Sequence, residues 1–292
     1  MPQPRMSVVV ASSNARPSVR DCLAVLVDHR RGDDVEILVV DNSHDGSAEI
    51  VKDDFPDVQL IAAPASALIP ELWSLGVRKS RGRIVAITTA HFVPDRNWVD
   101  AMLEAQESAV AGVGGAIENS ESAGLVDWAV YFCRYSQYML PFERGFAREI
   151  AGDNASYKRE HIDRYRHTWE NGFWELEVHA ELRKAGLSLL LTPSVVVYHH
   201  RSFGLRGFVR QRWQHGMQFG RQRAARLRWP RRALYITLSP AIPLVFLFRI
   251  ARQVFGKQRH RAKFVGALPA LGLFLMAWSS GELVGYLRGS SA

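Results

Sequence analysis

The sequence has only two cysteines, too few for a disulfide framework. Only Cys22 and Cys133 occur in 292 residues, each among apolar neighbours. A cysteine-based metal site needs more thiols at closer spacing. A reducing compartment therefore suits this chain.

A secretory signal and several common site motifs are also lacking. Residues 1–5 contain no apolar run, and Met6 already opens a strand-like segment, so we expect the catalytic part to remain in the cytoplasm. No P-loop, zinc spacing or Gly-x-Ser-x-Gly elbow occurs. The glycines at 112–115 lack the spacing of a dinucleotide-binding turn, which favours a tight strand turn instead.

Carboxylates are nearly absent from the C-terminal part of the chain. After Arg201 only Glu282 interrupts a series of arginines and lysines, and the whole chain has a formal charge of +8 and a pI near 9.8. This imbalance predicts an anionic partner. Two apolar segments, 233–248 and 264–287, interrupt the basic residues. The pattern therefore favours an anionic membrane surface over nucleic acid.

The two apolar segments differ in their suitability for crossing a membrane. The second has the roughly 20 apolar residues that a spanning helix needs, whereas prolines interrupt the shorter first segment. Lysine and arginine collect on the cytoplasmic side. We therefore expect the first segment to lie at the cytoplasmic interface and the second to cross, leaving Arg288 outside. A hairpin of two spans and a buried soluble subdomain remain alternatives.

The first 117 residues alternate between short β-branched runs and helical segments. This order predicts a mixed, mostly parallel sheet with helices on both faces, an α/β fold. Expected strands cover 7–11, 36–40, 58–62, 84–87 and 110–117. Expected helices cover 19–30, 47–54, 72–79 and 98–108.

Beyond residue 117 the periodicity weakens. Aromatic residues cluster at 128–142, either as a cleft wall or as ordinary core. Further expected elements are a helix at 173–185, strands at 188–191 and 195–199, and a long basic helix at 205–227. We expect a domain at 1–230, with a nucleotide-binding half to 117 and an acceptor half from 118, and a membrane-associated region at 231–292.

Polar residues follow two of the expected strands. Asp41 and Asp45 flank a turn after one strand, and Thr88 to His91 follow another. Ligands of open α/β sheets bind beyond such carboxyl ends. A carboxylate there accepts hydrogen bonds from a base or ribose, but Asn42, Asp45 and Gly46 equally suit a structural turn.

Several motifs, in order, resemble family 2 glycosyltransferases with the GT-A fold, a nucleotide-diphospho-sugar transferase fold. The resemblance covers roughly the first 230 residues. Its elements are Val40-Asp41-Asn42-Ser43-His44-Asp45-Gly46-Ser47, the strand and loop of 82–98 ending in Pro94 and Trp98, the stretch 151–159 with Gly152 and Asn154, the helix at 173–186, and Pro193–His199.

The resemblance assigns roles by position. Glu175 falls where the family places the carboxylate that deprotonates the acceptor hydroxyl, and Trp174 beside it would exclude water. Asp153, Asn154 and Trp174 fall on the acceptor side. The expected nucleotide-binding residues are Ala11, Ser12, Ser13, Asn14, Asp41, Asp45 and Thr89.

The sequence departs from the family at the diphosphate. Thr89-Ala90-His91 stands where the family has Asp-x-Asp for a divalent ion. Hard cations prefer carboxylate oxygens, so Mg²⁺ suits this site poorly; Mn²⁺ on His91, with His199 or His200 as a second ligand, is one substitute. The other is neutralisation of the diphosphate by cationic side chains, for which the candidates are Arg206, Arg210, Arg212 and His215; the arginines equally suit anionic lipid.

The resemblance and the basic tail together predict a membrane-associated inverting glycosyltransferase at the cytoplasmic face of a bacterial inner membrane. It would transfer a sugar from a UDP- or GDP-type donor to a hydroxyl of a lipid-linked or cell-envelope glycan, for polysaccharide biosynthesis. One alternative is a catalytically degenerate, nucleotide-binding scaffold subunit of a glycan-assembly complex. Another is a basic membrane-surface adaptor without a nucleotide site.

Overall fold

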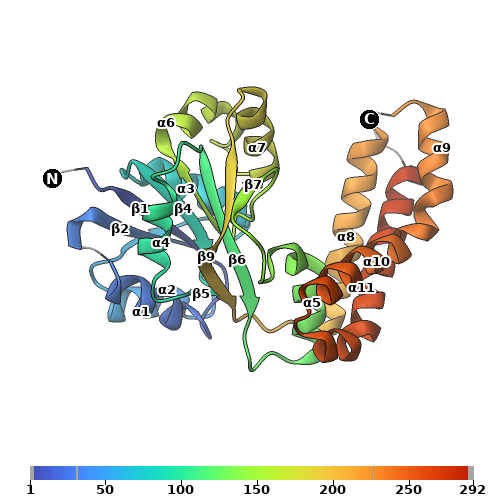
Figure 1. Cartoon of the computed structure of the whole chain (residues 1–292), viewed down its shortest axis with the longest axis horizontal. Coiled ribbons are helices and arrows are strands. Elements are labelled where there is room, and N and C mark those ends of the chain that lie inside the picture. Colours follow the sequence, from blue (N-terminus) through green and yellow to red (C-terminus); the bar gives the residue numbers. More distant parts are fainter. Residues whose placement is uncertain (1–2, 31, 226, 289–292) are drawn as a thin grey trace. The chain divides into compact units, whose positions relative to one another are not determined.

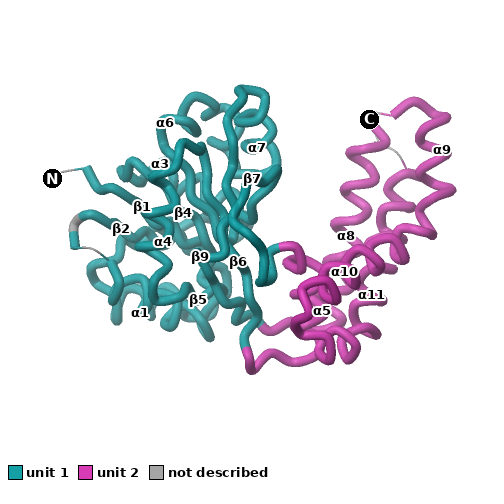
Figure 2. Tube along the Cα trace, viewed as in Figure 1, with its two compact units in different colours: residues 1–120, 138–201 teal, residues 121–137, 202–292 magenta. Residues whose placement is uncertain are grey.

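The computed structural model describes residues 3–30, 32–225 and 227–288, which form two compact units (Figure 2). The first, here the sheet unit, comprises 1–120 and 138–201. The second, the helical unit, comprises 121–137 and 202–292. The division after residue 201 differs from the domain boundary expected at 230, because the long basic helix belongs to the helical unit.

The sheet unit is built on a nine-stranded mixed sheet with the order β3-β2-β1-β4-β8-β6-β9-β5, and β7 pairs with β9 (Figure 1). β1, β2, β3 and β4 pair in parallel, as do β6 and β9, whereas β8 is antiparallel to β4 and β6. The expected mixed, mostly parallel sheet is confirmed. The strands are β1 (Met6–Ser12), β2 (Val35–Asp41), β3 (Gln59–Ala62), β4 (Ile84–Thr89), β5 (Phe92–Pro94), β6 (Gly112–Asn119), β7 (Gly145–Ala147), β8 (Asn154–Lys158) and β9 (Leu189–His199).

Helices cover the sheet because alternate strand residues point to opposite faces. Val9 of β1 and Ile87 of β4 share one core with Leu72 of α3 and Val178 of α7. Gly76 lets α3 approach closely, since a Cβ there would lie 2.2 Å from a methyl carbon of Val9. The helices of this unit are α1 (Val19–Asp28), α2 (Ser47–Asp54), α3 (Ile69–Lys79), α4 (Trp98–Ala105), α6 (Arg159–Ile162) and α7 (Glu175–Lys184).

Two strands differ from expectation. β8 lies in the middle of the sheet, although its sequence has no strand signal that we identified. The two short strands expected near 188–199 form one strand, β9, whose pairing with β6 shifts register between Gly115 and Ala116. The proline in the gap between them therefore sits beside an irregularity in pairing.

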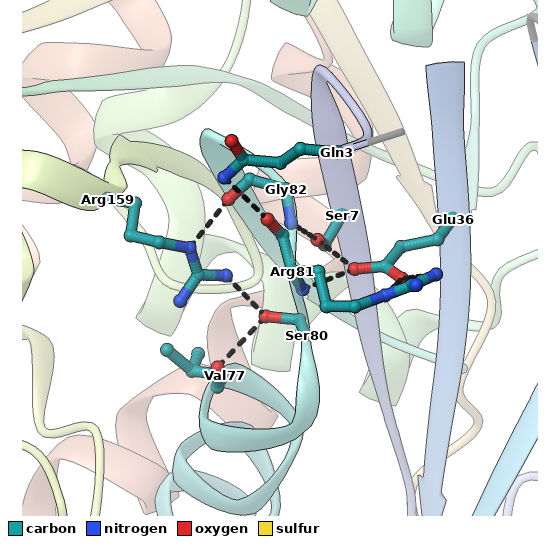
Figure 3. A network of polar contacts seen from close by, with 8 residues as sticks. All are labelled: Gln3, Ser7, Glu36, Val77, Ser80, Arg81, Gly82 and Arg159. Atoms are coloured by element: carbon teal, nitrogen blue, oxygen red, sulfur yellow. Dashed lines mark hydrogen bonds and ion pairs between the residues drawn. The ribbon is translucent and has the colours of Figure 1, made fainter. Parts of the chain in front are cut away.

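A polar network fixes the edge of the sheet where β1, β2 and β4 begin (Figure 3). The Ser7 hydroxyl donates to Glu36 at 2.6 Å and accepts from the Gly82 backbone N–H at 2.6 Å. Arg159 donates to the Gly82 carbonyl at 2.6 Å and to Ser80 Oγ at 2.8 Å. These bonds anchor the loop before β4. They thereby help to fix the register of β4 beside β1, which determines the residues at the carboxyl end of β4.

The helical unit contains α5 (Leu125–Tyr135), α8 (Leu205–Ala224), α9 (Trp229–Leu238), α10 (Ile242–Lys257) and α11 (Arg261–Arg288). The aromatic residues Trp128, Tyr131 and Phe132 of α5 are buried in it, where Phe132 packs edge-on to Phe264 of α11. Ordinary core packing therefore accounts for these aromatics.

Glycines bring α8 and α11 into backbone contact. A Cβ on Gly216 would lie 2.2 Å from the Trp278 carbonyl oxygen, and one on Gly281 would lie 2.1 Å from the Trp213 carbonyl oxygen. The two helices run in the same direction, because Phe208 meets Phe274 and, further along, Arg223 meets Tyr286. Small residues at helix contacts permit this close approach.

Two segments of the helical unit are long and apolar enough to cross a membrane. Trp229–Lys257 and Arg261–Arg288 have mean hydropathies of 1.8 and 1.5 over their most apolar windows, of which 11% and 39% are buried. Such low burial is unlike that of a core helix. The apolar C-terminal helices are thus suited to membrane association by length and composition.

Candidate functional site

The ends of three neighbouring strands carry most of the residues expected to bind a nucleotide. In the pairing of β1 with β2, Ser12 lies opposite Asp41, and in the pairing of β1 with β4, Ala11 lies opposite Thr89. All four are at least nine-tenths buried. The fold therefore places them side by side at the carboxyl edge of the sheet, where open α/β sheets bind ligands.

Ser43 joins the loops that follow β1 and β2. Its hydroxyl donates to Asp41 Oδ1 at 2.7 Å and accepts from the Asn14 backbone N–H at 2.8 Å. Asp41 Oδ2 accepts from the Ser43 backbone N–H at 2.9 Å. Asn14 adopts a positive φ of 52°, and its side chain accepts from the His44 backbone N–H at 3.3 Å. Ser13 to Asn14 and the Asp41 turn therefore form one hydrogen-bonded rim.

Asp45 is used within the fold. Its Oδ1 accepts from the Ser47 hydroxyl at 2.5 Å and the Ser47 backbone N–H at 3.1 Å, while Oδ2 accepts from the Arg16 backbone N–H at 3.0 Å. Burial would raise the pKa of the Asp45 carboxyl, but these hydrogen bonds lower it below its ordinary value. The carboxylate fastens the start of α2 to the loop after β1.

The tip of β4 positions His91 against the neighbouring loop. His91 is 6% exposed, and its Nε2 lies 3.1 Å from the Ser13 carbonyl oxygen. A carbonyl oxygen only accepts, so Nε2 carries the hydrogen and has no lone pair for a metal. His199, the last residue of β9, pairs with Phe92, and their rings are 4.9 Å apart. The fold therefore brings both histidines to the turn between β4 and β5.

The donor atoms at this turn do not fit a hard divalent cation. Both oxygens of Asp41 accept from Ser43, Thr89 supplies a neutral hydroxyl, and His91 Nε2 is a donor. Across residues 3–30, 32–225 and 227–288, no group of three or more His, Cys, Asp or Glu side chains is arranged to hold a metal ion.

The acceptor-side stretch continues the same edge through β4 and β8. The Thr88 hydroxyl donates to the Asp153 carbonyl at 2.8 Å, and Trp73 Nε1 donates to the Thr88 carbonyl at 2.7 Å. Asn154 is fully buried; its amide accepts from Trp98 Nε1 at 2.8 Å and donates to the carbonyls of Ala116 and Val195. Asn154 therefore holds strands together, whereas Asp153 is half-buried beside the edge.

Glu175 lies against this stretch. Its Oε1 is 3.3 Å from the position that a Cβ would take on Gly152, and the Trp73 ring is 2.8 Å from the same position. Trp174, expected to exclude water, is 45% exposed, whereas Trp73 is 3% exposed. The Phe173 backbone N–H donates to the Pro70 carbonyl at 2.7 Å, which ties the start of α7 to α3. Trp73, which the sequence analysis did not single out, is thus the tryptophan buried beside Gly152.

A polar chain near Glu175 is fully buried at Tyr157 and His179 and partly exposed at Glu149 and Arg183. Tyr157 pairs its hydroxyl with His179 Nε2 at 2.8 Å, His179 Nδ1 lies 2.6 Å from Glu149 Oε2, and Arg183 donates to Glu149 Oε1 at 2.8 Å. Glu175, His179 and Arg183 are spaced four residues apart and share one side of α7. Burial, followed by the charge of Glu175, raises the pKa of Tyr157 well above its ordinary value. These partners are distant in sequence, so no local pattern points to them.

The two arginines expected near the diphosphate belong to the other unit. Arg210 is an exposed residue of α8. Arg212, on the same helix, places its guanidinium 4.3 Å above the ring of Trp278. Their expected role at the diphosphate stays a prediction.

Comparisons with known proteins agree with this geometry. The family model described as glycosyl transferase family 2 matches residues 7–166. A comparison with curated proteins finds no match.

Two solved structures show the same fold at low sequence identity. A mannosyltransferase, PcManGT, from Pyrobaculum calidifontis in complex with GDP-Man and Mn²⁺ aligns with a TM-score of 0.59 and 18% identity over 97% of this chain and 88% of that one. S. aureus TarS in complex with UDP-GlcNAc aligns with a TM-score of 0.53 and 13% identity over 94% and 81% of the two chains.

Proposed function

Because the chain belongs to glycosyl transferase family 2 and is therefore a glycosyltransferase, we propose that it works at a membrane surface with inversion at the transferred sugar. The donor is a UDP- or GDP-type sugar nucleotide, and the acceptor is a hydroxyl of a lipid-linked or cell-envelope glycan. The similar folds bind GDP-Man and UDP-GlcNAc, which supports a donor of this class.

One observation carries the proposal. Glu175 lies against Gly152, and the adjoining Asp153 is hydrogen-bonded through its carbonyl to Thr88, next to the strand ends that hold Asp41 and Ser12. A carboxylate therefore stands at the acceptor-side end of a continuous rim whose other end suits a nucleotide. General-base catalysis needs such a carboxylate within reach of the hydroxyl that it deprotonates.

The step follows from these positions. Glu175 takes the proton of the acceptor hydroxyl as the oxygen attacks the anomeric carbon. The bond from that carbon to the diphosphate oxygen breaks, and the nucleoside diphosphate leaves with both electrons of that bond. Attack opposite to the leaving group inverts the anomeric configuration. Trp73 and the apolar core beneath it shield one side of this site from water.

The negative charge of the leaving diphosphate can be neutralised by a divalent ion or by arginine side chains. The comparison structure with Mn²⁺ supports a divalent ion for the fold, but the donor set at Thr89 and His91 is unsuited to one. If no ion binds, Arg210 and Arg212 supply the positive charge. A thermal-shift panel of UDP, GDP and their sugars with Mn²⁺, Mg²⁺ or chelator distinguishes the ion from the arginines.

Asp41 and Glu175 variants test the proposal. Asp41→Asn should abolish the thermal shift produced by the preferred nucleotide while the unliganded protein still unfolds cooperatively. Glu175→Gln should retain the nucleotide shift and lose transfer. If Glu175→Gln transfers sugar at the normal rate, another base acts. If no sugar nucleotide binds the unchanged chain, the proposed donor class is wrong.

The unusual Thr89-Ala90-His91 turn favours one alternative, a nucleotide-binding scaffold without turnover. Nucleotide would raise the melting temperature of such a scaffold as it would that of an active transferase, so the thermal shift alone does not distinguish them. Release of nucleoside diphosphate that depends on both acceptor and Glu175 excludes the scaffold, because a binding protein leaves its ligand intact.

We place the helical unit in the plane of the membrane interface. α8 contacts α11 backbone to backbone and carries arginines along its length, including Arg206 and Arg223. If α11 crossed the bilayer, α8 would take these charges with it, at a cost of about 2.5–3.5 kcal/mol for each arginine near the centre. With the helical unit at the interface, these arginines stay among the lipid headgroups and the cost is avoided. This proposal differs from the expectation from the sequence that segment 264–287 crosses the membrane.

A further inference from the structure

A cavity of about 240 Å³ lies within the helical unit, and its polar wall is basic. Arg134 of α5, Arg212 of α8 and Arg249 of α10 line it. None of its lining residues within the described parts of the chain is a carboxylate. Three arginines from three helices thus line one space, and its described wall contains no carboxylate.

Two carboxylates of this unit, Asp127 and Glu282, are engaged elsewhere. Asp127 accepts from the backbone N–H groups of Gly124 and Phe203, and Glu282 accepts from Trp278 Nε1 and the Tyr286 hydroxyl. Among the residues that the structure describes, Arg212 Nε is buried without a hydrogen-bond partner. A buried donor left unsatisfied costs free energy. An anion in the cavity would remove that cost.

The charges of Arg134 and Arg212 also act on the groups around them. Burial lowers the pKa of Arg212, and the charge of Arg134 lowers it further, although Cys133 opposes this. Burial and then Arg212 and Arg134 lower the pKa of His215. A second cavity of about 390 Å³ shares Arg249 and Gln253 with the first and adds Arg252 and Lys257. The basic surface therefore extends beyond the arginine-lined space.

The remaining wall is apolar. Phe246, Ile250 and Leu275 line the cavity beside the arginines. Two further apolar residues of α10, Leu244 and Phe248, are 69% and 68% exposed. Side chains of this size and exposure suit the boundary between headgroups and acyl chains. Cation and apolar surface are therefore adjacent, as an amphiphilic anion requires.

We propose that the cavity between α5, α8, α10 and α11 binds the phosphate group of an anionic membrane phospholipid. Arg134, Arg212 and Arg249 hold the phosphate oxygens, because guanidinium groups match them with paired N–H donors. The acyl chains lie along the apolar face of α10. The proposal rests on the membrane association proposed above, and it does not involve Glu175. Because it assigns Arg212 to the lipid phosphate, Arg210 alone remains as the arginine proposed for the donor diphosphate.

Vesicle flotation of the full chain tests the proposal. Vesicles of phosphatidylcholine with and without phosphatidylglycerol are compared for the unchanged chain, Arg249→Gln and Arg134→Gln. Loss of one charged hydrogen bond should weaken binding to the anionic vesicles about ten-fold. Arg231→Gln is the matched control, because Arg231 is an exposed arginine of α9 outside the cavity and its loss changes the net charge equally.

Cys133 gives a second readout that needs no substitution. It lines the cavity, whereas Cys22 is fully buried in the sheet unit, so a thiol reagent reports on Cys133. Phosphatidylglycerol vesicles should slow its modification several-fold more than phosphatidylcholine vesicles do. Arg249→Gln should abolish that difference.

Three outcomes would overturn the proposal. Equal weakening by Arg231→Gln and Arg249→Gln would mean diffuse attraction between the helical unit and the membrane. Protection of Cys133 by inorganic phosphate alone, matching that by anionic vesicles, would mean a site for free phosphate. Absence of Cys133 protection on bound vesicles would place the lipid elsewhere. Sugar-nucleotide thermal shifts, measured in parallel, show whether the proposed catalytic function stands.

Discussion

The hydroxyl of Tyr157 lies 2.8 Å from Nε2 of His179, and both side chains are fully buried. Glu149 accepts at the other ring nitrogen, so Nδ1 carries the hydrogen and Nε2 accepts from the tyrosine. Both residues are then neutral. Burial lowers the pKa of His179, although Glu149 opposes this, which agrees with a neutral imidazole.

This pair predicts how stability depends on pH. The pKa of His179 is lower in the folded protein than the value of about 6.5 in an unfolded chain. Below that unfolded pKa the unfolded state binds more protons, so the free energy of unfolding falls as the pH falls toward the folded pKa. Above it this contribution is constant. Denaturant unfolding at neutral and mildly acidic pH measures the slope.

His179→Gln should reduce that slope. The variant should also be less stable at neutral pH by about 1–3 kcal/mol, because Tyr157 loses a buried partner. The chain retains His200 and His215, whose pKa values burial also lowers, so part of the slope should persist. An unchanged slope would show that His179 does not resist protonation in the folded state.

Gly152 packs between the buried Trp73 ring and Glu175, the carboxylate that we propose as the base, so a larger residue there should affect both. In Gly152→Ala the new methyl group would lie 2.8 Å from the Trp73 ring and 3.3 Å from Glu175 Oε1. Either the tryptophan or the loop must move, which should cost about 1–3 kcal/mol of stability. Transfer should fall more than nucleotide binding does. Gly145→Ala is the control, because a Cβ there meets no atom within 4 Å.

The fold could be predicted where the signal was local. β1 and β2 contain the apolar runs 8–11 and 37–40, and α2 begins and ends at Ser47 and Asp54 as expected. β8 was missed because its buried face contains Asn154 and Ser156, which is unusual for a central strand. Their partners, Trp98 and Gln106, come from α4 and the residue after it. Only the tertiary structure shows that these polar groups are satisfied.

The site could be predicted in part for the same reason. Family motifs named Asp41 and Glu175, and the register places Asp41 at the carboxyl edge as expected. They could not show that Asp45 and Asn154 serve the fold, or that Trp73 rather than Trp174 is buried. Such roles depend on contacts between residues far apart in sequence.

Variants of two glutamates in the first turn of α7 can distinguish a role in catalysis from a role in helix stability. Glu175 and Glu177 both lie in the first turn of α7, where either favours the helix dipole. Glu177 is exposed, whereas Glu175 lies against Gly152. Glu175→Gln should lower the turnover number by about 100-fold or more, a typical contribution of general-base catalysis. Glu177→Gln should leave turnover within about two-fold, with a stability change below about 1 kcal/mol. Equal losses in the two variants would mean that the helix dipole, not base catalysis, explains the effect.

Two glycines of α11 should respond to alanine in opposite directions. A Cβ on Gly281 would lie 2.1 Å from the Trp213 carbonyl oxygen, and this backbone atom cannot move away without separating the helices. A Cβ on Gly272 meets nothing within 4 Å. Gly272→Ala should stabilise the chain by up to about 1 kcal/mol, since alanine favours helix over glycine.

Gly281→Ala should destabilise the helical unit by more than about 1 kcal/mol, because overpacking a close contact forces a backbone shift. Thermal unfolding in detergent compares the two variants under the same conditions. Cys133, which lines the cavity, should become more reactive only in Gly281→Ala if α8 moves away from α11. Equal stabilisation by both substitutions would mean that the two helices are further apart than the glycine contacts require.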